Sequence, residues 1–298
     1  MKKSILIIGL MAILCSCRVS FQKTRVSTVR NNVCKALRGK VVLYAVFVDS
    51  EGTHPWTEYD INSTKDSISK AINWIELQAK NNAIPLNVEF KNYSKNERVP
   101  VKSKYKYETL SKTMFHYRDL SKGIELVDNW SDQVSRLVAR GLPKDKSSVI
   151  LTQNKLSDRE RLIARLRDMY KTDNVALMFF TNNYYENEMS VVLHSASNDQ
   201  TEYGIVSEKR PSVIAHEFLH LFGAIDLYIS PFDRNRSQQR KKDKIMKLLP
   251  NEIMAFAHKD IDSLNISDLT KYLIGWENKL SEESKRMIAS KRQKFLEY

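Results

Sequence analysis

The stretch KVVLYAVFVD, residues 40–49, is the strongest indication of the fold. It is a continuous run of apolar, β-branched and aromatic residues with one charged residue at each end. A strand with one face in water alternates apolar and polar side chains, whereas a continuous apolar run is typical of a strand buried on both faces. We therefore expect residues 40–49 to lie inside a sheet that is covered on both sides.

The next segments predict a helix and a second strand. Residues 63–80 carry apolar side chains at helical spacing, and Ser63 or Thr64 supplies a start signal; the apolar positions are Ile68, Ile72, Ile75 and Ala79. A turn and a second strand follow within residues 81–93. Strand, helix and strand in this order are the signature of a right-handed crossover in a parallel sheet.

Residues 93–123 are expected to form a charged, irregular surface segment, and the pattern predicts more helices and strands after it. Helical patterns occupy 124–140 and 157–170, with a short apolar fragment at 147–152 that is compatible with a strand. Buried strands are expected at 174–182 and 189–197, and the loop between them is short enough for the two to pair antiparallel.

The C-terminal part of the chain has helical patterns separated by a basic run. A helix beginning near Pro211 should continue to Phe222 and end at Gly223. Residues 233–244 are expected to form an exposed basic loop, and helices are expected at 266–276 and 281–296. These elements together predict an α+β fold with an α/β-like N-terminal subdomain.

The N-terminus has the pattern of a bacterial export signal. Two lysines precede an apolar run, and Leu14, Cys15, Ser16 and Cys17 resemble a lipobox in which the cysteine after a small residue is lipidated. We expect residues 1–16 to be a signal peptide, Cys17 to carry the lipid, residues 17–39 to be anchor and tether, and residues 40–298 to form the domain. A plain secretory signal is the alternative. The expected location is the cell surface or the periplasmic face of a membrane, with membrane contact through the lipid only.

Composition fits a globular domain without a disulfide framework. The chain has 298 residues, 42% hydrophobic residues and three cysteines, and after removal of the signal only Cys34 would accompany Cys17. The net charge is +13, but the basic residues are scattered and do not form a recognisable nucleic-acid module. We expect no specific nucleic-acid partner; a solvated surface is one reading of the charge, and an acidic partner is the other.

The stretch HEFLHLFGAID, residues 216–226, carries the chemistry. On a helix, residues four apart project from the same side, so His216 and His220 can bind one cation. Neutral imidazoles suit zinc, and Glu217 would stand at the rim of such a site, where a general base is needed. Gly223 allows the helix to stop and the chain to turn back, which brings Asp226 within reach as a third, oxygen ligand. A core helix whose histidines merely form hydrogen bonds is the competing interpretation.

The pattern HExxHxxGxxD resembles the zinc signature of the metzincin metallopeptidases. Most metzincins have histidine at the last position, and the aspartate here is similar to the variant in snapalysin-type enzymes. The resemblance implies a mixed, mostly parallel sheet with an antiparallel edge strand, for which 189–196 is the candidate. It also implies an active-site helix and a small C-terminal subdomain with a methionine turn and a helix. Met254, after Pro250 and Asn251, is the candidate for the turn methionine, and Met246 competes with it.

The expected activity is that of a zinc-dependent endopeptidase acting on a protein or peptide substrate. Zn²⁺ would activate water, and Glu217 would accept its proton. Tyr228 could stabilise an oxyanion, although a packing or surface role is the alternative. A second hypothesis is a non-catalytic surface lipoprotein with a structural metal site that binds an acidic glycan or protein partner. A third is a metal-dependent hydrolase acting on another bond.

Overall fold

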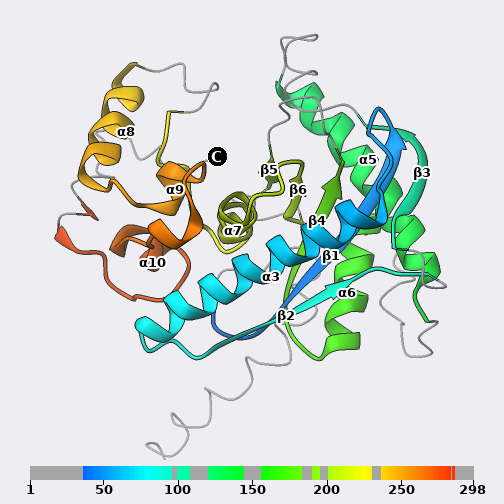
Figure 1. Ribbon diagram of the computed structural model, residues 1–298, viewed down its shortest axis with the longest axis horizontal. Helices are drawn as coiled ribbons and strands as arrows, with labels where there is room; N and C mark the ends of the chain where they lie inside the picture. The colour runs from blue at the N-terminus through cyan, green and yellow to red at the C-terminus, as the bar shows by residue number, and fades with distance from the viewer. Residues whose placement is uncertain are drawn as a thin grey trace, which may run out of the picture.

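The protein forms a six-stranded, mostly parallel sheet with helices on both faces (Figure 1). The computed structural model describes residues 36–95, 99–107, 120–143, 156–182, 190–194, 201–229, 236–282 and 284–285. The strands are β1 (Gly39–Glu51), β2 (Leu86–Asn92), β3 (Val101–Lys106), β4 (Asn174–Thr181), β5 (Val191–Leu193) and β6 (Tyr203–Val206). Their order is β2, β1, β4, β6, β5, and β3 also pairs with β1. The expectation of an α+β fold with a mostly parallel sheet and an antiparallel edge is confirmed.

Strand β1 is the centre of the sheet and is buried on both faces, as the sequence predicts. It pairs in parallel with β2, β3 and β4. Its side chains alternate between two cores, one of which contains Val41, Leu43, Ala45 and Phe47 and the other Val42, Tyr44, Val46 and Val48. Because both faces are covered, neither set needs to be polar.

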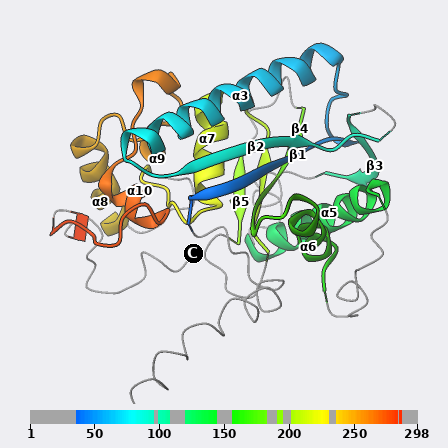
Figure 2. The same cartoon turned by 90° about the horizontal axis from the view of Figure 1, so that it is seen from below.

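Three helices cover the sheet around β1. Helix α3 (Glu58–Asn81) packs on one face, and α5 (Leu120–Gly141) and α6 (Asp158–Tyr170) pack on the other. Figure 2 shows this layering with the sheet between α3 and the α5–α6 pair. Helix α3 starts earlier than the predicted residue 63, because Thr57 and Asp60 form a capping box: Thr57 Oγ1 accepts from Asp60 N, and Asp60 Oδ2 accepts from Thr57 N.

The antiparallel edge is confirmed at β5, but its predicted partner is wrong. β5 pairs antiparallel with β6, and β6 pairs in parallel with β4, so β6 lies between the two strands that were expected to be neighbours. β6 escaped prediction because its run of four residues, YGIV, contains a glycine and is very short. Just after β5, His194 Nε2 lies 2.9 Å from both carboxylate oxygens of Asp128 on α5.

Two segments predicted as irregular have regular structure. Residues 101–106, within the supposed surface segment, form β3 and extend the sheet beside β1. The basic run predicted as an exposed loop at 233–244 is helical from residue 236 onward, in α8 (Arg236–Leu248). Ile245 is buried on one side of α8, while Arg240 and Lys244 are exposed on the other. The run is therefore a surface helix that is held by a few apolar side chains.

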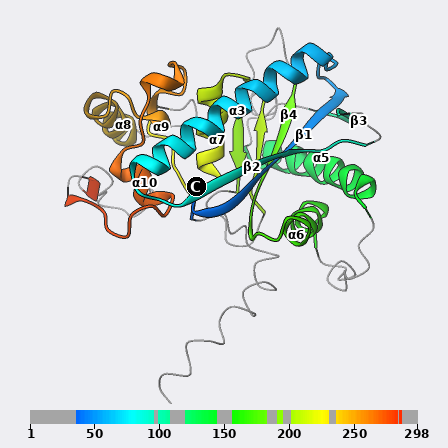
Figure 3. The same ribbon diagram turned by 60° about the horizontal axis from the view of Figure 1, so that its bottom comes forward.

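The C-terminal elements lie together beside α7 (Pro211–His220), as Figures 1 and 3 show. They are α8, α9 (Ile253–Phe256), the 3₁₀ turn η2 (Ile261–Ser263) and α10 (Asp268–Leu273), which falls within the predicted helix 266–276. The start of the described chain packs against α10: Leu37 is fully buried, its N–H donates to the Ile274 carbonyl, and its carbonyl accepts from the Trp276 indole.

Several expectations lie outside the described residues. They concern the signal segment 1–16, Cys17, Cys34, the apolar fragment 147–152 and most of the predicted C-terminal helix 281–296. None of the described helices combines the length and the apolarity that crossing a membrane requires.

The packing of α3 predicts a contrast between two neighbouring positions. Ile75 is 1% exposed and lies in the core beneath β1, whereas Leu77 is 52% exposed on the outer side of the same helix. We expect Ile75→Ala to lower the free energy of unfolding by about 2–5 kcal/mol because it leaves a cavity. Leu77→Ala should change it by no more than about 0.5 kcal/mol. Urea unfolding followed by circular dichroism measures both, and equal losses would contradict this placement of α3.

Candidate metal centre

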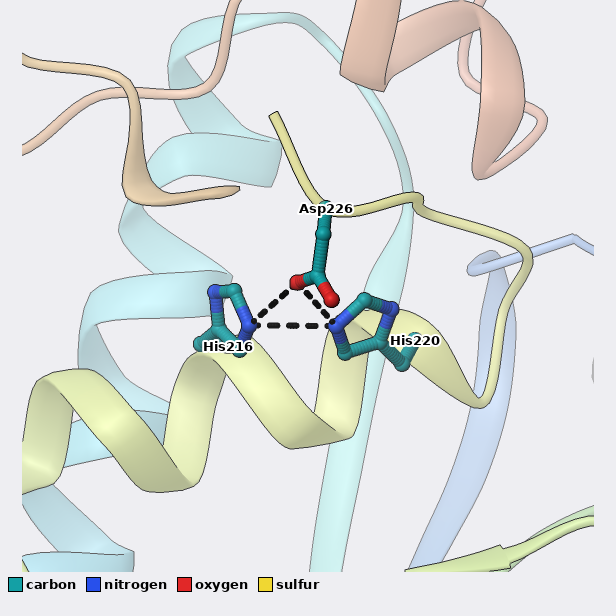
Figure 4. A group of neighbouring side chains, drawn as sticks. All are labelled: His216, His220 and Asp226. Atoms are coloured by element: carbon teal, nitrogen blue, oxygen red, sulfur yellow. Dashed lines mark hydrogen bonds and ion pairs between the residues drawn. The ribbon is translucent and has the colours of Figure 1, made fainter. Parts of the chain in front are cut away.

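Helix α7 holds the two histidines of the sequence motif on a rigid support. Pro211 occupies its first turn, and Ile214, Ala215, Phe218 and Leu219 are buried in the same core as α3. These apolar residues fix the rotation of α7 about its axis. His216 and His220, one turn apart, therefore project on the same side of the helix, as Figure 4 shows.

Three donor atoms from this region converge. His216 Nε2 and His220 Nε2 are 3.0 Å apart, and Asp226 Oδ1 lies 3.1 Å from the first and 3.0 Å from the second. The three side chains point toward one another, two from α7 and one from the loop that follows it (Figure 4). The structure thus brings together the three side chains that the sequence motif names, and their binding of a metal stays a prediction.

The outer nitrogen of each imidazole is held by a backbone carbonyl. His216 Nδ1 lies 3.1 Å from the carbonyl oxygen of Ile253, and His220 Nδ1 lies 2.7 Å from that of Ala224. A carbonyl oxygen can only accept, so both Nδ1 atoms carry a proton and donate. In the neutral rings, both Nε2 atoms then present lone pairs to each other and to Asp226. Such an arrangement requires a cation or a shared proton at its centre.

A sharp turn delivers Asp226. The last turn of α7 tightens through the hydrogen bonds Leu221 N to Phe218 O and Gly223 N to His220 O, and Gly223 has a φ of +97°. This left-handed conformation reverses the chain at the predicted glycine. Beyond Asp226, Leu227 N donates to the Met254 carbonyl at 2.9 Å, which ties the loop to α9.

The electrostatics of the cluster are strongly coupled. Burial lowers the pKa of the His220 imidazole, but the Asp226 carboxylate, together with Glu217 and the Ala224 carbonyl, outweighs burial and raises this pKa to about 9. Burial alone would raise the pKa of Asp226, yet the two imidazoles hold it well below its usual range. The carboxylate is therefore ionised, and positive charge at the centre is favoured.

Glu217 lies next to this centre and is only 5% exposed. Burial raises the pKa of its carboxyl group, although the nearby imidazoles of His216 and His220 act to lower it. Among the residues that the structure describes, its carboxylate has no hydrogen-bond partner. A carboxyl group that is nearly buried and has a raised pKa is a candidate for a functional group, because perturbed pKa values concentrate at functional sites.

The donor set fits a divalent transition metal. Two imidazole nitrogens and one carboxylate oxygen are ligands that zinc uses in three-residue sites, at about 2.0–2.2 Å. Around a tetrahedral ion at these distances, neighbouring donors lie about 3.3–3.6 Å apart, so the cluster would have to open by only a few tenths of an ångström. The Asp226 side chain is 32% exposed, whereas those of His216 and His220 are 4% and 12% exposed, so solvent reaches the centre from the side of Asp226.

The remaining predicted site residues lie nearby or outside the described chain. Met254 is fully buried in α9, next to the residue whose carbonyl holds His216, and the Tyr228 ring centroid is 6.0 Å from that of His216. Met246, the competing candidate, is partly buried on α8.

Comparisons of the chain with protein-family models, with curated protein sequences and with solved structures found no match.

Sequence reasoning missed the groups that orient the two imidazole rings. The carbonyls of Ile253 and Ala224 carry no side-chain signal, because every residue has a carbonyl. Glu252, which is fully buried directly before Ile253, was also missed. Its sequence signal is a single charged residue within the LLPNEIMAF stretch, residues 248–256.

The turn at Gly223 gives a prediction about the site's framework. A Cβ added there would lie 3.1 Å from the Leu273 carbonyl oxygen and would sit on a backbone with positive φ. We expect Gly223→Ala to cost about 1–3 kcal/mol of unfolding free energy. Gly204→Ala is the matched control, because its Cβ would meet only side-chain atoms at ordinary distances of 3.5 Å or more. Urea unfolding of both variants tests this, and a similar change in the two would be the contrary result.

Proposed function

We propose that this chain is a zinc-dependent endopeptidase that hydrolyses peptide bonds with a metal-activated water. The observation that carries the proposal is the convergence of His216, His220 and Asp226 beside a nearly buried glutamate that lacks a hydrogen-bond partner in the described chain. In a purely structural zinc site, four protein ligands fill the coordination shell and no such glutamate is needed. A catalytic site has three protein ligands, a position for water and a general base.

Each residue has a distinct task in this proposal. Zn²⁺ held by the three side chains would supply Lewis acidity, polarising the substrate carbonyl and lowering the pKa of water toward about 7. Glu217 accepts the proton of the attacking water and passes it to the departing amine. Burial raises the pKa of Glu217, and a raised pKa suits a carboxyl group that must both take and give a proton. The bonds of the two Nδ1 atoms to carbonyls keep both Nε2 lone pairs available as ligands.

The sheet supports a metzincin-type arrangement. β5 is an antiparallel edge strand, and an extended peptide could add to such an edge by backbone pairing. In this arrangement Met254 is the methionine of the turn that supports the metal, and Tyr228 is a candidate helper for the oxyanion. The proposed location of the enzyme is a bacterial membrane surface, to which the N-terminal sequence would attach it through a lipid on Cys17.

Replacement of Glu217 is the direct test of the mechanism. We expect Glu217→Gln to retain one zinc ion per chain but to cleave peptides about 10²–10⁴-fold more slowly, because only the general base is lost. Glu208→Gln is the matched control, since Glu208 is a partly exposed glutamate shortly before α7. Metal analysis and cleavage of a mixed peptide library measure the two properties.

The same experiment separates the competing functions. The endopeptidase proposal would be contradicted if Glu217→Gln cleaved peptides as fast as the wild type. It would also be contradicted if the wild type still cleaved peptides after complete metal removal. A wild-type chain that binds zinc but cleaves no peptide would instead favour the non-catalytic metal site with an acidic glycan or protein partner.

The third ligand can be tested separately. We expect Asp226→Asn to weaken zinc binding by more than about 100-fold, because loss of an inner ligand should exceed the roughly 10–100-fold effect of losing an outer partner. Competition with a chromophoric chelator measures the affinity. Wild-type affinity in this variant would remove Asp226 from the ligand set.

A further inference from the structure

A buried carboxylate lies just behind the metal centre. Glu252 is fully buried and directly precedes α9. Its Oε1 accepts from Met254 N at 3.3 Å and from Thr270 Oγ1 at 3.0 Å, and its Oε2 accepts from Ser267 N at 2.5 Å. Glu252 therefore joins the first turn of α9 to the first turn of α10.

The position of this carboxylate is costly. Burial raises the pKa of Glu252, and its hydrogen bonds with Ser267, Met254 and Thr270 act to lower it. Within the described chain, no lysine, arginine or histidine forms an ion pair with it. A buried carboxylate is tolerated only where its hydrogen bonds are well placed, so the three donors define one geometry for the turn.

The turn that Glu252 fixes is the one that holds the metal ligands. The carbonyl of Ile253, the next residue, accepts from His216 Nδ1, and the carbonyl of Met254 accepts from Leu227 N, beside Asp226. α9 has only four residues, too few to form a stable helix alone. Its orientation therefore depends on contacts such as those of Glu252, together with the hydrogen bond from Ile253 N to the Asn265 carbonyl.

We propose that Glu252 is a positioning residue of the metal centre, which acts through two consecutive carbonyls to orient His216 and to place the loop carrying Asp226. This inference rests on the proposed function only in that the cluster binds a metal; it does not require that the chain cleave peptides. Glu252 does not touch the ligand atoms. Its effect should therefore be seen in metal affinity and coordination geometry.

The test compares Glu252 with a cap that is far from the centre. Glu252→Gln keeps an oxygen for Thr270 and Met254 but turns an amide donor toward Ser267 N–H, and Glu252→Ala removes all three bonds. Ser157→Ala is the matched control, because Ser157 caps α6 on the opposite face of the sheet and accepts from Glu160 N. All three changes should lower the thermal midpoint.

Metal binding distinguishes positioning from general stability. We expect Glu252→Gln to weaken Zn²⁺ binding about 10–100-fold and Glu252→Ala to weaken it more, as for other outer partners of metal ligands. The visible spectrum of the Co²⁺-substituted protein should shift in both Glu252 variants and stay unchanged in Ser157→Ala. Wild-type affinity and spectrum in the Glu252 variants would overturn the proposal, as would an equal loss of affinity in Ser157→Ala.

Two further measurements cover the remaining outcomes. If the Glu252 variants do not fold, Thr270→Val removes a single hydrogen bond from the carboxylate, and it should weaken Zn²⁺ binding several-fold; unchanged binding would contradict the proposal.

If the wild-type chain binds no zinc, the proposed function fails, and nitrogen NMR of the metal-free protein still reports on Glu252. In the wild type, the proton of the His216 ring should be on Nδ1, whereas in a folded Glu252 variant it should be distributed between Nδ1 and Nε2. The same proton position in both proteins would refute the positioning role.

Discussion

The rest of the site depends on the fixing of two imidazole rings by backbone carbonyls. The carbonyl oxygens of Ile253 and Ala224 can only accept a hydrogen bond, so the Nδ1 atoms of His216 and His220 donate to them. The Nε2 atoms of both rings then face each other and Asp226. Three electron-rich atoms then lie within 3.1 Å of one another. This arrangement is favourable only when positive charge lies at its centre, and either a shared proton on the imidazoles or a bound cation supplies that charge.

Different parts of the fold hold the three side chains of this cluster in place. The sheet and α3 hold α7 through its apolar side, and the C-terminal elements supply the carbonyl for His216 and the tie to the Asp226 loop. The centre thus lies where residues far apart in the sequence meet, with the histidines at 216 and 220 and their support at 252–254. Rigid elements on both sides limit how far the donors can move when the charge at the centre changes.

Much of the framework is readable from local sequence patterns. The continuous apolar run of β1 and the periodic apolar residues of α3, α5 and α6 predict those elements, since their burial leaves a strong signature. β6 and β3 were missed because a four-residue strand with a glycine and a strand rich in lysine lack such a signature. The motif predicted which residues would gather at the centre, but the long-range contacts of Glu252 leave no periodic trace.

The border strands β5 and β2 of the described sheet also affect how copies of this chain meet. β5 spans only three residues, so its edge can pair with a short extended peptide but offers little to a long strand of a neighbouring copy. β2, at the other side, carries Glu89 and Lys91, and Glu89 also pairs with Lys40. A second molecule that docked there would have to match or displace these charges. The short length of β5 and the charged side chains of β2 therefore both oppose the addition of further molecules to the sheet, which is the step by which fibrils grow.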